Sequence, residues 1–170
     1  EERKGLDVLI DALPRLPAHA RVWIASDGPD TARLKAAAAG DERVEWLGRI
    51  DEGEKIRRLR GASVLCAPSL RGESFGMILL EAMAAETPIV ASDLPGYRKV
   101  IGEGEPAALL VPPGDPAALG AALRRVLEEP ALASSLAAAG DLRAAAFSMD
   151  RLAERYVELY RSAIAGVPPV

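Results

Sequence analysis

Two glutamates of this 170-residue chain bracket the start of an apolar segment, a pattern that can bind a charged ligand. Glu73 and Glu81 are separated by seven residues within Gly72–Pro88, which reads GESFGMILLEAMAAETP. Gly76 is typical of a turn where the backbone comes close to another group, and the apolar residues after it predict a helix. A helix start carries unpaired N–H groups and about +0.5 elementary charge, so it can seat an anion.

The two carboxylates restrict what that anion can be attached to. Ionised carboxylates only accept hydrogen bonds, so they suit the hydroxyl groups of a ligand. A sugar and a ribose joined by a diphosphate fit a site with an anion seat between Glu73 and Glu81. The alternative is an ordinary helix start with two exposed glutamates, because exposed glutamate is common.

The same stretch resembles a family signature. The residues GESFG, the second glutamate and EAMAA resemble the motif of the retaining GT-B glycosyltransferases of the glycogen synthase-like family. The longer run Gly72–Ile101, which includes SDLPGYRKVI, is similar to bacterial phosphatidylinositol mannosyltransferases. The similarity extends from Arg3-Lys4-Gly5 to about Tyr160 and favours the functional interpretation of the motif over exposed glutamates.

The resemblance implies roles for individual residues. Glu73 would hold the hydroxyls of the donor sugar and act in catalysis, and Glu81 would hold the nucleotide ribose. Lys4 would contact the donor diphosphate as a second catalytic residue; a lysine at a helix start otherwise opposes the helix dipole. An arginine that the family carries upstream would fall before Glu1. The backbone facing the diphosphate would come from Ser74, Phe75, Gly76, Met77 and Ile78.

The loop Gly48–Lys55 is a further candidate, because it follows a predicted strand, where open α/β sheets bind ligands. By resemblance, the backbone of Arg49 and Ile50 would contact the nucleobase, assisted by Lys55. A polar loop followed by a charged surface helix explains the same residues equally well.

Two positions depart from the family pattern. Ser26 stands in a turn where the family often has glycine, and Glu86 stands where a glycine would end the motif helix. Left-handed backbone is common at a helix end, and a residue other than glycine there costs on the order of 1 kcal/mol. Both departures put the local backbone geometry in question and leave the ligand side chains in place.

The hydrophobic pattern predicts an α/β fold in one domain, residues 1–170. Alternating strands and helices predict a doubly wound, Rossmann-like parallel sheet with helices on both faces, the C-terminal half of a GT-B fold by resemblance. That fold has a central first strand, which would precede Arg3. The expected strands are Arg21–Ala25, Val44–Leu47, Val64–Ala67, Ile89–Ser92 and Ala107–Val111. The expected helices are Leu6–Leu13 kinked or ended by Pro14, Thr31–Ala39 with Asp30 as N-cap, Glu52–Arg60, the motif helix, Gly96–Ile101, a helix that follows the N-cap Asp115, Pro130–Ala146 and Asp150–Ala165.

The charge, the cysteine content and the apolar runs of the chain argue against some classes of function. The net charge of –4, with scattered basic residues and 4% aromatics, argues against a nucleic-acid partner. The single Cys66 cannot form an internal disulfide, which fits a reducing, cytoplasmic compartment. No apolar run is long enough to span a bilayer. No cofactor or metal is expected, since the nucleotide sugar is a substrate and no cluster of cysteine and histidine is present.

These observations, with the resemblance, predict the donor-binding half of a retaining glycosyltransferase. It would transfer mannose from GDP-mannose to a lipid such as phosphatidylinositol. Its expected partners are the nucleotide sugar and an N-terminal acceptor-binding domain absent from these residues, against which the helix at about 150–165 would pack. That domain would make any peripheral contact with the inner face of the plasma membrane. The residues alone are expected to be inactive, and unstable or self-associated unless the first strand is supplied.

Two alternatives stay open. A nucleotide-sugar 2-epimerase of the same fold would make a new sugar isomer without any acceptor. A noncatalytic nucleotide-sugar-binding module would bind donor without any transferase half encoded beside it.

Overall fold

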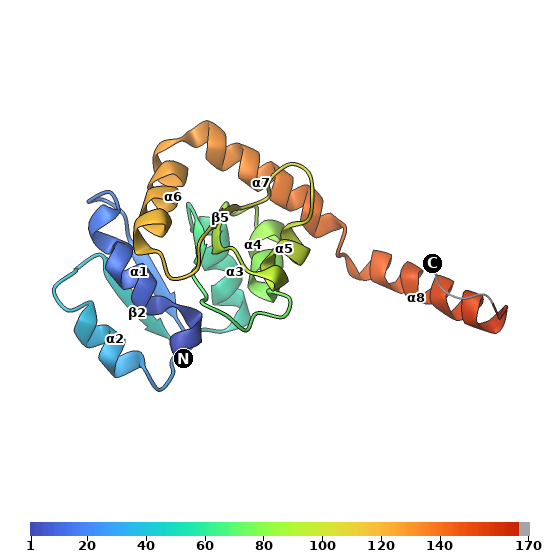
Figure 1. The fold of residues 1–170 in the computed structure, drawn as a ribbon, viewed down its shortest axis with the longest axis horizontal. Coiled ribbons are helices and arrows are strands. Elements are labelled where there is room, and N and C mark those ends of the chain that lie inside the picture. Colours follow the sequence, from blue (N-terminus) through green and yellow to red (C-terminus); the bar gives the residue numbers. More distant parts are fainter. Residues whose placement is uncertain (167–170) are drawn as a thin grey trace.

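The computed structural model describes residues 1–166 as parallel strands flanked by helices (Figure 1). The strands are β1 (Val22–Ala25), β2 (Val44–Gly48), β3 (Leu65–Ala67), β4 (Ile89–Ser92) and β5 (Leu109–Val111). The helices are α1 (Leu6–Ala12), α2 (Thr31–Ala37), α3 (Glu52–Gly61), α4 (Met77–Ala84), α5 (Pro95–Ile101), α6 (Pro116–Glu128), α7 (Pro130–Ala145) and α8 (Met149–Ile164). Two short 3₁₀ turns are η1 (Glu2–Lys4) and η2 (Leu13–Arg15). The predicted α/β fold class and element order are confirmed, with boundaries shifted by a few residues.

The strands form two separate parallel ladders. One pairs β1 with β2, and the other has the order β3-β4-β5. Consequently one edge of β1 and one edge of β3 pair with no strand among residues 1–166. The expectation that a central first strand would precede Arg3 stays a prediction.

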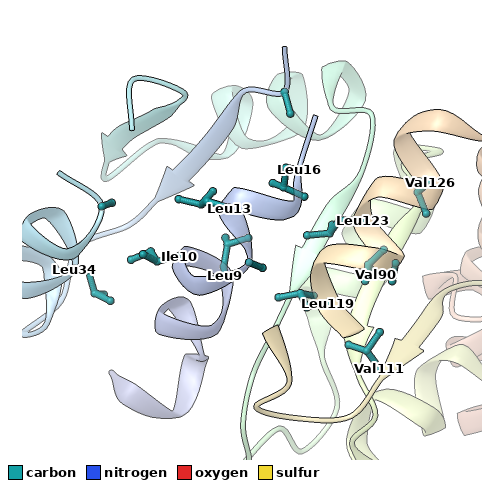
Figure 2. Packing of buried hydrophobic residues seen from close by; sticks show 14 of the residues in the cluster. Leu9, Ile10, Leu13, Leu16, Leu34, Val90, Val111, Leu119, Leu123 and Val126 are labelled. Atoms are coloured by element: carbon teal, nitrogen blue, oxygen red, sulfur yellow. The ribbon is translucent and has the colours of Figure 1, made fainter. Parts of the chain in front are cut away.

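Strand β4 is buried on both faces of the sheet. All four of its residues are buried, and successive side chains point to opposite faces. Val90 packs into a core cluster with Leu9 and Leu13 before β1 and with Leu119 and Leu123 of α6 (Figure 2). Its neighbours Ile89 and Ala91 belong to a second cluster on the other face, with residues of α4 and α5. Side chains of β1 and β2 also pack against the first cluster, so it joins the two ladders.

Helix α7 covers α4 through a close contact at Gly140. A Cβ atom at Gly140 would lie 3.2 Å from the side chain of Met83 on α4. Both helices can approach because glycine adds no side chain at that point. This contact fixes α4, the motif helix, against the body of the domain.

Aspartates were predicted to cap the starts of α2 and α6. The cap is confirmed for α6 and wrong for α2, where the aspartate precedes the helix without capping it. Asp115 accepts hydrogen bonds from two backbone N–H groups at the start of α6, as expected. Asp30 precedes α2 as predicted, but its side chain makes no capping hydrogen bond. The carboxylate of Asp30 instead pairs with the amino group of Glu1 at 3.0 Å. The hydroxyl oxygen of Thr31 accepts from the N–H of Gly28. The backbone of Asp30 is itself helical, with φ –87° and ψ –4°, whereas a capping residue has an extended backbone that directs its side chain to the first N–H groups of the helix.

Ser26 and Glu86 are the two non-glycine residues with positive φ among the described residues, at 79° and 58°. These are the two positions where the sequence lacks a family glycine. Glu86 follows α4 and its N–H donates to the carbonyl of Met83, a helix-end arrangement. Both residues therefore adopt the left-handed backbone that glycine would adopt at these positions, and as non-glycine residues they are strained there.

Helix α8 extends away from the rest of the molecule (Figure 1). None of its residues is buried. Several large apolar side chains are exposed along it: Met149, Leu152, Tyr156, Val157, Leu159, Tyr160 and Ile164. Among residues 1–166, none of the helices combines the length and the apolar character needed to cross a bilayer.

Candidate functional site

The start of α4 is built on Gly76, which adopts φ 88° in the left-handed region. A Cβ atom at Gly76 would lie 2.6 Å from the ring of Tyr97. Glycine is therefore required at this position for two reasons: the left-handed backbone, and the ring packed against it. The sequence predicted a close approach at Gly76, and in the structure the approaching group is Tyr97. No side chain caps the first turn of α4, and Met77 there is 60% exposed.

The site also brings together Lys4 and Glu73, which lie 69 positions apart in the sequence. Lys4 Nζ donates to Glu73 Oε1 at 2.6 Å. Arg3, which the sequence did not single out, places Nη1 3.5 Å from the same oxygen. The side chain of Glu73 is only 12% exposed, whereas that of Lys4 is 46% exposed.

Two loops hold this ion pair in place. Gly5 lies against the strand-end residue Pro68, so closely that a Cβ at Gly5 would fall 1.9 Å from the carbonyl oxygen of Pro68. The N–H of Leu70 donates to the carbonyl of Arg3 at 2.8 Å. The turn before α1 is thereby fixed to the loop that follows β3, and Lys4 is fixed near Glu73.

Opposing effects set the charge of Glu73. Burial alone would raise its pKa, while hydrogen bonds from Lys4 and Ser69 and the charges of Lys4 and Arg3 lower it. The net result holds the pKa of Glu73 below its ordinary value of 4.5. Glu73 is therefore an ionised hydrogen-bond acceptor at neutral pH, as contact with sugar hydroxyls requires.

Glu81 lies on the second turn of α4 and pairs with Lys55 of α3. The distance from Lys55 Nζ to a carboxylate oxygen of Glu81 is 2.9 Å. Lys55 also contacts Glu52 at 2.8 Å, and the carboxylates of Glu52 and Glu81 raise the pKa of Lys55. Lys55, which the sequence predicted to assist contact with the nucleobase, forms this ion pair with Glu81, and its contact with a base stays a prediction.

Arg49 and Ile50 follow β2 and were predicted to contact the nucleobase. Gly48, just before them, has φ 64°, and its carbonyl accepts from the N–H of Ser26 at 2.6 Å. This bond joins the carboxyl ends of β1 and β2, the edge of a parallel sheet where ligands bind. Among the described residues, no ion pair or side-chain hydrogen bond links Arg49 or Ile50 to Glu73 or Glu81.

The remaining predicted residues lie between the two glutamates. Phe75 packs edge-to-face on Phe147, with ring centroids 5.6 Å apart. Arg143 stacks on Phe147 and donates to the carbonyls of Val100 and Lys99 at the end of α5. Thus Phe75 anchors the motif loop to the segment that leads into α8. Ser74 lies just before Phe75, and Ile78 is half-buried in the first turn of α4.

Sequence reasoning missed two residues of this site, Ser69 and Tyr97. Ser69 follows Pro68 at the carboxyl end of β3, and that position was the available signal. Tyr97 belongs to the run that resembles the mannosyltransferases, yet its type and spacing suggest only a core aromatic. Over the described residues, no three His, Cys, Asp or Glu side chains are grouped so that they could hold a metal ion.

The parallel strands with helices on both faces, and the two carboxylates around the start of α4, agree with the glycosyltransferase resemblance. The chain belongs to the family described as Glycosyl transferases group 1, whose model matches residues 1–129. The resemblance to retaining GT-B glycosyltransferases is thereby confirmed.

The curated relatives agree with the resemblance. The phosphatidyl-myo-inositol mannosyltransferase of Mycobacterium leprae is 40% identical over 166 residues, which cover 95% of this chain and 44% of that protein. The protein of the same name from Mycolicibacterium smegmatis is 36% identical over 165 residues, covering 95% and 42%. The chain therefore spans less than half the length of the curated relatives it matches.

Solved structures share the fold. Sucrose-phosphate synthase from Thermosynechococcus elongatus is 30% identical with a TM-score of 0.82, covering 98% of this chain and 44% of that one. Anabaena Alr3699/HepE, solved in complex with UDP-glucose, has a TM-score of 0.83 at 21% identity, covering 95% and 46%. The second likeness concerns the fold alone.

Proposed function

We propose that this chain is the donor-binding half of a retaining glycosyltransferase. It transfers mannose from GDP-mannose to a lipid acceptor such as phosphatidylinositol. The observation that supports this most is the meeting of Lys4 and Glu73 beside the start of α4, with Glu81 on the second turn of the same helix. Relatives named phosphatidyl-myo-inositol mannosyltransferase favour mannose as the sugar.

The proposed chemistry breaks the bond between the anomeric carbon of the sugar and the diphosphate oxygen. The diphosphate leaves with the bonding electrons, the acceptor hydroxyl oxygen bonds to the same face of the sugar, and the hydroxyl proton is released. Charge develops on the diphosphate as it leaves, so fixed positive groups beside it lower the barrier. Lys4 and the unpaired N–H groups at the start of α4 are placed to supply them.

The two glutamates contact the two parts of the donor on either side of its diphosphate. Glu73 accepts hydrogen bonds from the sugar hydroxyls, and Glu81, held by Lys55, accepts them from the ribose. Backbone groups of Arg49 and Ile50 lie at the strand ends where the base would extend. No metal or other cofactor enters this scheme.

The acceptor site belongs to the rest of the enzyme in this proposal. The exposed apolar side of α8, including Leu152, Tyr156 and Leu159, packs against that N-terminal domain, because no residue of α8 is buried here. Contact with the lipid acceptor at the cytoplasmic face of the plasma membrane is made through that domain and not through these residues.

The test is a transfer assay with the full-length enzyme, labelled GDP-mannose and phosphatidylinositol vesicles. The proposal predicts a mannosylated lipid, and a fall in turnover of about 100-fold for Lys4→Ala, the order seen when one charge-stabilising group is removed. Release of a new sugar isomer without acceptor would indicate an epimerase. Donor binding without transfer would indicate a noncatalytic module. Comparable transfer by residues 1–170 alone would contradict the division into two halves.

A further inference from the structure

A line of hydrogen bonds runs from the core of the domain to Glu73. Tyr97 on α5 donates from its hydroxyl to Ser69 Oγ at 3.1 Å. Ser69, in the loop after β3, donates to Glu73 Oε1 at 2.9 Å. Tyr97 and Ser69 are 2% and 3% exposed, so water does not compete for these bonds.

Tyr97 is held as a proton donor. Burial raises the pKa of its phenol, and the nearby charge of Glu73 raises it further against the opposing hydrogen bond to Ser69. The hydroxyl therefore keeps its proton at neutral pH. Because its hydrogen goes to Ser69, the hydrogen of Ser69 is directed to Glu73, and each bond polarises the next.

The first turn of α5 also packs directly against the motif loop. The ring of Tyr97 lies 2.6 Å from the position that a Cβ at Gly76 would take. A Cβ at Gly96 would fall 1.9 Å from the carbonyl oxygen of Glu73. Tyr97 therefore touches the loop at Gly76 and reaches its other end, Glu73, through Ser69.

The contacts at Glu73 are uneven between its two oxygens. Lys4, Ser69 and Arg3 all direct their hydrogen-bonding or charged atoms to Oε1. Within residues 1–166 the structure describes no such contact to Oε2. The carboxylate is thus held by one oxygen, and the other is left to accept hydrogen bonds from a ligand.

We propose that Tyr97 is a positioning residue that acts through Ser69 to hold Glu73 Oε1, so that Oε2 faces the donor sugar. This inference rests on the proposed function and adds to it the residues that orient the sugar-binding carboxylate. Ser69 matters most once donor is bound, since Lys4 then turns to the diphosphate and the hydrogen bond from Ser69 remains.

The test compares Tyr97→Phe, Ser69→Ala and the double variant in the full-length enzyme, with Ser135→Ala on the exposed surface of α7 as the control for loss of a hydroxyl. Tyr97→Phe keeps the ring against Gly76 and removes only the hydroxyl. Affinities for GDP and for GDP-mannose are measured by calorimetry, and kcat and KM for transfer by assay. The pKa of Glu73 is followed by carbon NMR of its carboxylate.

For Ser69→Ala we expect GDP-mannose binding to weaken by about ten-fold, the order for loss of a hydrogen bond to a charged group, with GDP binding unchanged. Tyr97→Phe should weaken GDP-mannose binding by about three-fold, because Ser69 keeps its bond to Glu73 but loses the partner that orients it. The double variant should match Ser69→Ala, since Tyr97 acts through Ser69. The pKa of Glu73 should rise in both single variants and stay unchanged in Ser135→Ala.

Equal losses for GDP and GDP-mannose would show a packing role and overturn the inference. So would additive effects in the double variant, or a Tyr97→Phe enzyme that matches wild type while wild type binds GDP-mannose. A wild-type enzyme that does not bind GDP-mannose would overturn the proposed function itself, and the sugar-facing role of Tyr97 with it.

Discussion

Lys4 and Glu73 form an ion pair between the turn that precedes α1 and the loop that follows β3, with Nζ 2.6 Å from Oε1. The pairing keeps Glu73 ionised inside a mostly buried environment and keeps a lysine beside the start of α4. In the proposed function, this pair would supply a cation for the diphosphate and an acceptor for the sugar hydroxyls.

The first prediction concerns the pH dependence of stability. Glu73 has a folded-state pKa below 4.5, so its contribution is fully present above the unfolded-state pKa and is lost as pH falls through the folded-state pKa. We expect Glu73→Gln to lower the free energy of unfolding by about 1 kcal/mol at neutral pH, since Lys4 is half-exposed. Denaturant titrations at several pH values should show the difference shrink as the pH falls below 4.5, the ordinary pKa of the carboxyl. A difference that is constant over this range would contradict the assignment.

The second prediction separates the two glutamates. Glu81→Ala should weaken binding of both GDP and GDP-mannose, whereas Glu73→Ala should weaken mainly GDP-mannose. Loss of a charged hydrogen-bond partner costs roughly 1.5–3 kcal/mol, which calorimetry resolves readily. The reverse pattern for the two ligands would show that their roles are exchanged.

Particular residues show how far the sequence could predict this molecule. The strands and helices follow from hydrophobic periodicity, and the break at Pro14 and the cap at Asp115 follow from local chemistry. The family resemblance assigned Lys4 and Glu73 to one ligand, but their direct contact was not predicted, because no local pattern indicates a contact over 69 positions. Ser69 and Tyr97 were missed because their contacts are tertiary. Asp30 was mistaken for a side-chain cap because its residue type suits a cap, whereas its helical backbone, φ –87° and ψ –4°, does not show in the sequence.

The third prediction concerns Gly76. Gly76→Ala should destabilise the fold by about 2–3 kcal/mol, because it combines left-handed backbone with a clash against the ring of Tyr97. Gly40→Ala is the matched control, since Gly40 has φ 94° but no atom within 4 Å of the position that a Cβ would take there. Its cost should be only the backbone strain, about 1–2 kcal/mol. Equal urea midpoints for the two variants would mean that Tyr97 does not constrain Gly76.

The fourth prediction concerns Ser26 and Glu86, whose positive φ strains the backbone. Ser26→Gly and Glu86→Gly should each raise the free energy of unfolding by about 0.5–1 kcal/mol, because glycine relieves the positive φ while adding some unfolded-state entropy. Thermal or urea unfolding of each variant measures this change. A loss of stability in either variant would mean that its side chain makes a compensating contact.

The fifth prediction concerns α8. Leu152→Asp removes no buried packing within the described residues, because Leu152 is exposed in them. The same substitution should lower the stability and the transfer activity of the full-length enzyme, where the apolar side of α8 is proposed to be covered. An unaffected full-length enzyme would remove α8 from the proposed domain interface.

The central claim is that a nucleotide diphosphate binds at the start of α4. Amide NMR of the isotope-labelled full-length enzyme during titration with GDP tests it most directly. Saturable shifts should appear at the backbone N–H groups of Gly76, Met77 and Ile78, and they should weaken in Lys4→Ala. Saturable shifts elsewhere in the domain, with these three amides unmoved, would contradict it.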